Sequence, residues 1–307
     1  GKTTILRAIA QNTTRRVVYL AFNDQIAREC RQSFPANAAC MTTHALVHRQ
    51  LPAALRAKGK NLGHDLTAPM IRGFLQQRFD IAPDDLWYAS SAIIGMLQAF
   101  FITDDTEIGP QHSPYRHFTS LHRNPYDDES TRREIRWSRA AWQSIISADG
   151  ELPLSHDAYL KLGHLRGVRF DYDVLLVDEV QDLNPVTLAI IARTGCQIVY
   201  VGDRNQQLYE WHGAVDAMDS VKVDRTASLT QSWRLGPAVA DVANRILERL
   251  GSEQIRANSQ VDAEIAKRHQ RFRIVRSNTT LFTKTVECAA RYQRVHILGG
   301  TAQLHAL

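Results

Sequence analysis

The sequence predicts an α/β protein in which helices cover both faces of a parallel sheet. Short apolar runs suited to buried strands alternate with stretches of helical periodicity, and short turns join them. Two of these runs, 173–177 and 197–201, are followed by Asp-Glu and by Gly-Asp. Polar residues at the carboxyl ends of parallel strands are typical of the edge at which open α/β sheets bind ligands.

The predicted elements follow this alternation along most of the chain. The run RVVYLAF at 16–22 has the apolar character of a buried strand, and Pro185 favours a helix that starts at its own position. Residues 103–128 contain three prolines and many charges, which predicts an irregular connection. The predicted strands are 16–22, 38–41, 173–177, 197–201, 227–229, 272–275 and 295–298. The predicted helices are 24–34, 44–55, 66–79, 84–101, 129–146, 185–192, 237–250 and 281–291.

The distribution of these elements predicts two domains, the first of which carries an insertion. Residues 48–168 are predicted to be helical throughout, which interrupts the alternation and indicates an inserted subdomain. The first domain then comprises 1–47 and 169–228, and a second, incomplete domain covers 229–307. At 307 residues the chain is long enough to give two domains a buried core each.

Composition narrows the class of protein only a little. The net charge of +5 and a pI near 9.1 mildly favour a polyanionic partner. The four cysteines form no CxxC pair and have no histidine at ligand spacing, so we expect reduced thiols and no zinc site. No apolar run approaches the ~20 residues of a membrane span, and no signal pattern opens the chain. We therefore expect no membrane association and no secretion, and a cytoplasmic location, or a nuclear one if the protein is eukaryotic.

The first chemical signal is Gly1-Lys2-Thr3-Thr4, which looks like the second half of a phosphate-binding loop. In such a loop backbone N–H groups at a helix N-terminus surround the β-phosphate, a lysine reaches the β- and γ-phosphates, and a hydroxyl binds Mg²⁺. Lys2 would be this lysine, and Thr3 would provide the hydroxyl that binds Mg²⁺. GKTT is a common tetrapeptide, so by itself it leaves open the alternative of no nucleotide site. Because the first half of the loop is absent, we expect a piece of a longer protein, truncated at both ends.

The second signal is the segment DVLLVDEVQD, in which a predicted strand ends in two carboxylates. Asp178 is predicted to hold the Mg²⁺ shell, and Glu179 to orient and deprotonate the attacking water. The plain alternative is an acidic surface turn after a buried strand. The order DExQD disfavours that alternative.

Two further segments place polar and aromatic residues after strands. In VGDRNQQLYEWHGA, Gln206 follows a strand at a distance suited to sensing the γ-phosphate, while the rings of Tyr209 and Trp211 are candidates to stack on unpaired bases. In LTQSWRLGPAVADVAN, Arg234 is placed at a domain junction to contact the γ-phosphate, and Trp233 to lie against the adenine. A place in the core is the alternative for each ring, and an ordinary exposed position is the alternative for Arg234.

Together these segments resemble the UvrD-like helicases of superfamily one and, within that group, the F-box DNA helicase family. The order of the signals along the chain is the order of that group's motifs. Other segments that look like the F-box helicases are AFNDQIAREC, FPANAACMTTHAL, SHDAYLKLGHL, LTQSWRLGPAVADV, RSNTTLFTKTV and RVHILGG. The resemblance implies a RecA-like fold of the P-loop NTPase class, with an inserted helical subdomain and the start of a second RecA-like domain.

The resemblance also implies an ATP-dependent DNA helicase that moves 3′ to 5′ along single-stranded DNA and acts in repair or recombination. The implied cofactors are ATP and Mg²⁺, and the implied partner is single-stranded DNA, while no protein partner is indicated. By position it assigns to the nucleotide site Gly1, Lys2, Thr3, Thr4, Asp178, Glu179, Gln206, Trp233 and Arg234. By position it assigns to the DNA strand Phe22, Asn23, Thr43, His44, Tyr209 and Trp211. For His44 a core or capping histidine at a helix start is the alternative.

Two positions depart from the pattern of that family. Asp24 stands where relatives often carry lysine, which would remove a favourable contact with a DNA phosphate. His212 replaces an arginine, which puts the coupling between DNA and nucleotide in doubt. These departures keep open a DNA-binding module that has lost its motor function, and the motor of a RecB-like helicase–nuclease is a further alternative. We also expect this segment alone to be a poor ATPase, because the later motifs of the family are absent from it.

Overall fold

The computed structural model describes most of the chain and divides it into two compact units, Gly1–Leu229 and Thr230–Leu307. The described residues are 1–62, 65–114, 129–207, 217–261, 275, 277–291 and 294–295. The helices of the first unit are α1 (Lys2–Gln11), α2 (Asp24–Arg31), α3 (Thr43–Gln50), α4 (Ala53–Leu62), α5 (Ala68–Arg78), α6 (Leu86–Ile102), α7 (Glu129–Ile146), α8 (His156–Leu165), α9 (Pro185–Ala192) and α10 (Ala217–Ser220). Short 3₁₀ turns lie at Pro83–Asp85, Pro110–His112, Val180–Asp182 and Arg204–Gln206.

A four-stranded sheet in the order β2-β1-β3-β4 forms the centre of the first unit, and all its strand pairs are parallel. Its strands are β1 (Val17–Ala21), β2 (Ala38–Thr42), β3 (Val174–Val177) and β4 (Gln197–Tyr200). Because the strands are parallel, all their carboxyl ends lie at one edge of the sheet. The predicted α/β class with a parallel sheet is confirmed, and the arrangement is that of a RecA-like P-loop domain.

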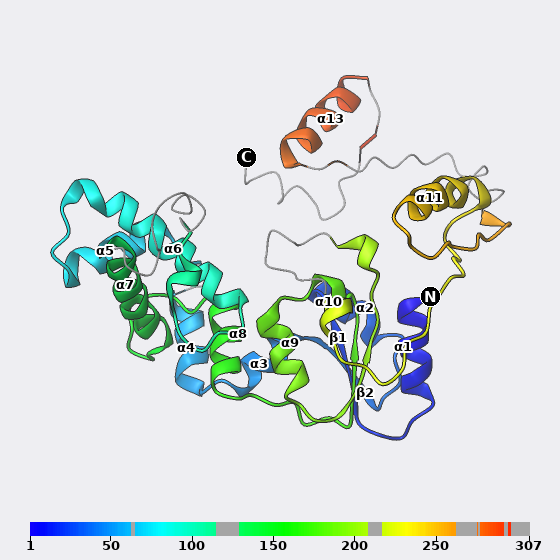
Figure 1. Cartoon of the computed structure of the whole chain (residues 1–307), viewed down its shortest axis with the longest axis horizontal. Coiled ribbons are helices and arrows are strands. Elements are labelled where there is room, and N and C mark those ends of the chain that lie inside the picture. The colour runs from blue at the N-terminus through cyan, green and yellow to red at the C-terminus, as the bar shows by residue number, and fades with distance from the viewer. Residues whose placement is uncertain are drawn as a thin grey trace. The chain divides into compact units, whose positions relative to one another are not determined.

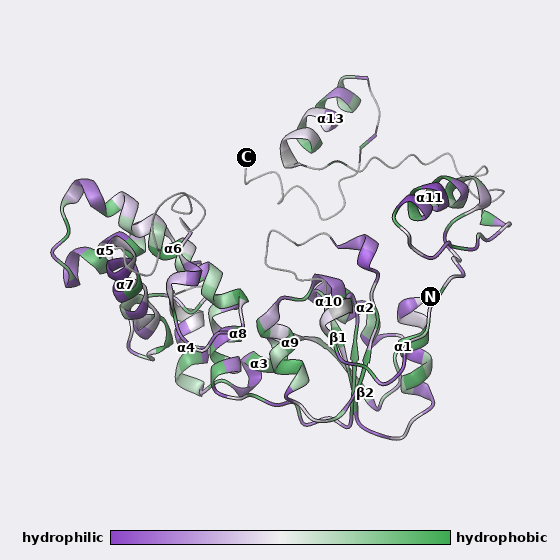
Figure 2. Ribbon diagram, viewed as in Figure 1, coloured by the Kyte–Doolittle hydropathy of each residue, from purple (hydrophilic) through white to green (hydrophobic). Residues whose placement is uncertain are grey.

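Alternate residues of the strands face two separate cores. Val17 and Tyr19 of β1 pack in a core with residues of α1 and α2. Val18 and Leu20 point to the opposite face, into a larger core that includes residues of α3 and α9. Figure 1 shows α1 and α9 on opposite sides of the sheet, and Figure 2 shows hydrophobic residues along the strands. Burial on both faces explains why these strands are continuous apolar runs in the sequence.

From α4 to α8 every described element is helical, in the region predicted as an insertion. The central helix is α6, which packs against α5, α7 and α8. Together with the turn before it, Pro83–Ile102 is long and apolar enough to cross a membrane by length and composition, but half of the tested window is buried. Its residues Ile93 and Phe100 belong to the larger core of the first unit, so we interpret α6 as a core helix.

Two predicted elements were wrong. The predicted helix 44–55 is two helices, because Pro52 lacks the N–H that a continuous helix would require, and α3 ends before it at Gln50. Residues 227–229 are described by the structure but do not form the predicted strand. The second unit has an isolated β-bridge between Gln231 and Arg256. The predicted strands 272–275 and 295–298 lie mostly outside the described residues. The helices described in the second unit are α11 (Pro237–Arg249) and α13 (Asn278–Ala290).

Candidate nucleotide-binding site

The start of α1 and the end of β3 come together at the carboxyl edge of the sheet. α1 begins at Lys2 with Gly1 as its N-cap, and no side chain caps its first N–H groups. Asp178 and Glu179 directly follow β3. The structure thus brings Lys2, Thr3 and the two acids into contact, although Lys2 and Glu179 are 177 positions apart in the sequence.

The ammonium of Lys2 forms an ion pair with Oε2 of Glu179, and both side chains are partly exposed. Glu179 itself has left-handed backbone angles, φ 51° and ψ 46°, and is the only non-glycine residue with positive φ in the described chain. Its neighbours hold this unfavourable conformation, since the N–H of Val180 donates to the carbonyl oxygen of Val201 at 3.1 Å. Backbone strain of this kind is concentrated at functional sites.

The carboxylate of Asp178 is buried, with 6% of the residue exposed, and it accepts three hydrogen bonds. Oδ2 accepts from the hydroxyl of Thr3 at 3.1 Å and from the hydroxyl of Tyr19 at 2.7 Å. Oδ1 accepts from the backbone N–H of Glu179 at 3.0 Å. Burial, reinforced by the charge of Asp178, raises the pKa of Tyr19 above its usual range, so its hydroxyl stays a donor.

This arrangement fits a Mg²⁺-bound nucleotide. A hydroxyl and a carboxylate that already touch, those of Thr3 and Asp178, are hard oxygen groups of the kind Mg²⁺ prefers. Lys2 holds an anion, the carboxylate of Glu179, where a phosphate could take its place. Helix α1 begins at Lys2 itself, and backbone N–H groups at a helix N-terminus bind anions.

Gln181 joins this centre to the segment that follows β4. Its side chain is buried, with 1% of the residue exposed, and its Nε2 donates to Oε2 of Glu179 at 3.0 Å. Its Oε1 accepts from the backbone N–H of Asp203 at 3.0 Å. Asp203 in turn accepts from Nε2 of Gln206 at 2.6 Å. Any Cβ at Gly202 would stand 2.7 Å from Oε1 of Gln181, so glycine permits this close approach.

Four of the six residues predicted to contact DNA lie after β1 and β2, at the same edge of the sheet. Phe22 follows β1, and Asn23 caps α2 by accepting a hydrogen bond from a backbone N–H at 2.9 Å. Thr43 is buried at the start of α3. His44 is half-buried, and its Nε2 lies 3.8 Å from Oδ1 of Asp157. The N-cap of α3 is Thr42, so the capping alternative for His44 does not hold.

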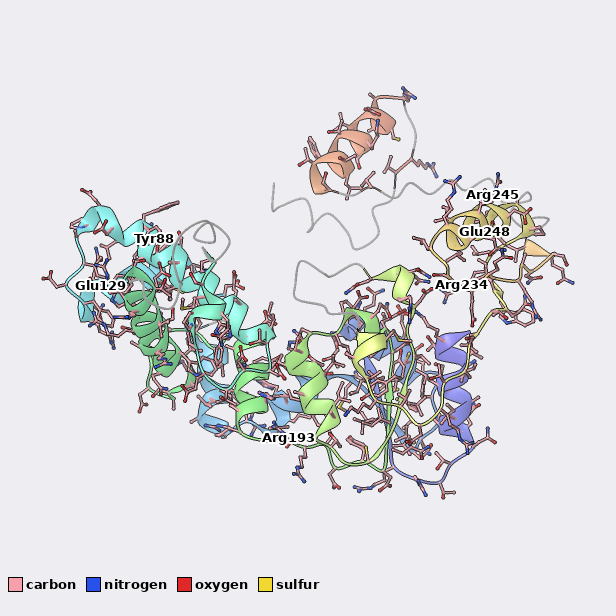
Figure 3. The ribbon with its side chains drawn as sticks, in the orientation of Figure 1. Tyr88, Glu129, Arg193, Arg234, Arg245 and Glu248 are labelled. Atoms are coloured by element: carbon pink, nitrogen blue, oxygen red, sulfur yellow. The ribbon has the colours of Figure 1, made fainter. Side chains whose placement is uncertain are left out.

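For the other predicted residues the structure shows only their local surroundings or nothing at all. Thr4 follows Thr3 on α1, and its side chain is exposed. Arg234 and Trp233 are exposed in the second unit, Trp233 to 68%, and Figure 3 shows Arg234 on the segment before α11. Tyr209, Trp211 and His212 lie outside the described residues, so their roles stay predictions.

Asp24, the first departure from the family pattern, has a local role. It is in the first turn of α2 and forms an ion pair with Arg28 one turn later. An acidic residue there stabilises the positive end of the helix dipole. The charge of Asp24 is thereby partly offset within its own helix.

Sequence reasoning missed the roles of Tyr19 and Gln181. Gln181 is part of the DEVQD segment, in which the sequence predicts roles only for Asp178 and Glu179. Tyr19 carries the one hydroxyl in the run VVYLA. A polar atom in a strand that is buried on both faces needs a hydrogen-bond partner, so this hydroxyl was the feature that could have indicated a contact.

A family model described as an AAA domain matches residues 1–212. The chain belongs to this family. The AAA domain so defined contains the whole network from Lys2 to Gln206.

Two curated F-box helicases are similar to the chain over most of its length, and a third helicase over a shorter part. F-box DNA helicase 1 of Gallus gallus is 29% identical over 98% of this chain, and F-box DNA helicase protein 1 of Schizosaccharomyces pombe is 27% identical over 82%. A probable DNA helicase II homolog of Mycoplasma pneumoniae is 33% identical over 30% of the chain and 14% of its own length. The chain spans 31% and 30% of the two F-box proteins. The predicted resemblance to UvrD-like and F-box DNA helicases is confirmed.

Proposed function

We propose that this chain is the ATP-binding motor segment of a DNA helicase that moves 3′ to 5′ along single-stranded DNA. The observation that carries the proposal is the contact of Lys2 with Glu179 and of Thr3 with Asp178 at the carboxyl edge of the sheet. Lys2 provides an ammonium, Glu179 a base, Thr3 a hydroxyl and Asp178 a carboxylate. Transfer of a phosphoryl group to water employs these four kinds of group. The names of the relatives, which are DNA helicases, support DNA as the polymer.

In the proposed reaction the ion pair between Lys2 and Glu179 opens when ATP binds. Lys2 turns to the γ-phosphate, and the carboxylate of Glu179 is released to accept a proton from the attacking water. Gln181 keeps a hydrogen bond to that carboxylate and limits its movement. Thr3 and Asp178 would hold Mg²⁺, which when bound neutralises charge on the phosphate oxygens.

The proposed roles of the segments follow the predicted domains. Residues 1–47 and 169–228 form the first motor domain, 48–168 its insertion, and 229–307 the start of a second motor domain that supplies Arg234. Single-stranded DNA contacts Phe22, Asn23, Thr43 and His44, and Tyr209 and Trp211 extend that contact. A role in DNA repair or recombination is supported by the resemblance alone.

Strand separation by the full-length protein tests the proposal. The substrates are duplexes with a single-stranded 3′ or 5′ tail, and the matched variant is Lys2→Met, which keeps side-chain length and removes the charge. We expect ATP-dependent separation of the 3′-tailed duplex only, and none with the variant. ATP hydrolysis without separation of either duplex would instead favour a DNA-binding module that has lost its motor function.

A further inference from the structure

The hydroxyl of Tyr19 lies in a mostly apolar core, beside the thiol of Cys30. Tyr19 is fully buried in the middle of β1, among the side chains of the smaller core between the sheet and the helices α1 and α2. Its ring packs against that of Phe34, with centroids 4.7 Å apart. A phenylalanine would fill the same space, so packing alone does not require the hydroxyl.

The hydroxyl reaches the carboxylate that the proposed function assigns to Mg²⁺. It donates to Oδ2 of Asp178 at 2.7 Å, the shortest of the three hydrogen bonds that this carboxylate accepts. Hydrogen bonds from a neutral hydroxyl to a buried carboxylate are among the stronger ones in proteins. The bond therefore fixes one oxygen of Asp178 in a site from which most water is excluded.

The three donors to Asp178 differ in how firmly they are held. The oxygen of Thr3 would also coordinate Mg²⁺, so the cation as well as Asp178 would set the position of this hydroxyl. The N–H of Glu179 belongs to the adjacent residue and moves with Asp178. Tyr19 lies on a strand that is paired with β2 on one side and β3 on the other. Of the three, Tyr19 holds the carboxylate from a fixed part of the sheet.

We propose that Tyr19 is a positioning residue, which orients the carboxylate of Asp178 for Mg²⁺ through its hydroxyl. This inference rests on the proposed function, in which Asp178 and Thr3 hold the metal. It predicts that Tyr19→Phe weakens metal binding in the presence of nucleotide. Nucleotide binding without metal should not change, since Tyr19 reaches the site only through Asp178.

Metal binding can be measured without turnover. Mn²⁺ replaces Mg²⁺, ADP occupies the site, and the electron paramagnetic resonance signal of free Mn²⁺ reports binding to the full-length protein. Binding of a fluorescent ADP analogue without metal and thermal melting are recorded for each variant. The matched control is Tyr200→Phe on β4, which removes a hydroxyl that has no hydrogen-bond partner among the described residues. Asp178→Asn tests the metal site itself.

We expect Tyr19→Phe to weaken Mn²⁺ binding about tenfold, in keeping with the loss of one hydrogen bond to a charged group. Its metal-free nucleotide binding should match that of Tyr200→Phe, while the loss of the bond to Asp178 should lower its melting temperature. Wild-type Mn²⁺ affinity in Tyr19→Phe, with affinity lost in Asp178→Asn, would overturn this inference and leave the proposed function standing. Unchanged Mn²⁺ affinity in Asp178→Asn would overturn the proposed metal site, and the inference with it. Weakened metal-free nucleotide binding in Tyr19→Phe would show that the whole site is disturbed and would overturn positioning.

Discussion

The buried amide of Gln181 connects the ends of two neighbouring strands, because its Oε1 accepts the backbone N–H of Asp203 at 3.0 Å. Its Nε2 donates to Glu179, at the end of β3, also at 3.0 Å. Gln206 is bonded to the side chain of the same Asp203. If the Glu179 carboxylate moves when ATP binds, the side chain of Gln181 would therefore transmit that movement to the segment after β4.

Replacement of Gln181 by methionine should impair turnover more than ATP affinity. Gln181→Met keeps the length of the side chain but leaves the N–H of Asp203 without its partner, which should lower the free energy of unfolding by about 1–3 kcal/mol. Because the carboxylate of Glu179 loses a bond that holds it, kcat should fall while KM for ATP stays within a few-fold. Steady-state hydrolysis and urea unfolding measure the two effects.

The matched control is Gln25→Met on the surface of α2, where the amide donates to Glu29. This exposed change should alter the free energy of unfolding by no more than about 0.5 kcal/mol and leave kcat unaffected. A wild-type kcat in Gln181→Met would show that the bond to Glu179 does not position the base.

Lys58 should be essential to the stability of the helical block. Its buried ammonium donates to the carbonyl oxygens of Ser144, Ile145 and Ser147, at 2.6, 2.9 and 2.8 Å, and so caps the C-terminal end of α7. Burial lowers its pKa to about 8, which leaves it mostly charged at neutral pH. Lys58→Met leaves these oxygens without the donor and should lower the free energy of unfolding by about 2–3 kcal/mol.

The fluorescence of Trp137 and Trp142, both buried on α7, reports this unfolding in urea. Lys222→Met, at an exposed position, is the control and should stay within about 0.5 kcal/mol of the wild type. Equal midpoints for the two variants would contradict the capping role of Lys58.

The helical block should lose stability as the pH falls below neutrality. Burial lowers the pKa of His164, whose Nε2 lies 3.0 Å from the carbonyl oxygen of Asp104 and which also faces Lys161 and Arg193. In the unfolded chain a histidine titrates near pH 6.5, so between the two pKa values the unfolded state binds more protons. Stability is then fully present above about pH 6.5 and is lost as the pH drops through that value. Burial also lowers the pKa of His112, so this residue too contributes a loss of stability as the pH falls.

His164→Gln is the informative variant, because its amide places a donor near the position of Nε2 and does not titrate. Urea transitions at pH 7.5 and 5.5 should show a smaller loss of stability in this variant than in the wild type. The loss of stability that remains in the variant comes in part from His112. An identical loss in both proteins would mean that His164 does not contribute.

The fold could be predicted from the sequence where burial imposes a simple pattern. β1 and β3 are buried on both faces and therefore appear as continuous apolar runs. The helix predicted for 44–55 failed because the apolar periodicity continues through Pro52, while the backbone hydrogen bonding does not. The apolar character of 227–229, at the end of the first unit, also predicted a strand that these residues do not form.

At the site, the contacts of Lys2 with Glu179 and of Thr3 with Asp178 agree with the predicted grouping, since parallel strands bring their carboxyl ends to one edge. The bond from Tyr19 to Asp178 could not be predicted in the same way. It depends on the register of β1 against β3, in which Tyr19 pairs with Leu176, and a sequence does not state its register. The roles of Arg234 and Trp233 depend on the placement of the second unit and stay predictions.

The most direct test of the central claim is ATP hydrolysis by the full-length protein, with and without single-stranded DNA, beside Glu179→Gln. The account predicts hydrolysis that DNA stimulates, and a variant that still binds ATP but turns it over about 10²–10⁴-fold more slowly, as expected when a general base is lost. Unchanged hydrolysis in Glu179→Gln would contradict the assignment of the base, and hydrolysis that DNA does not stimulate would contradict the motor.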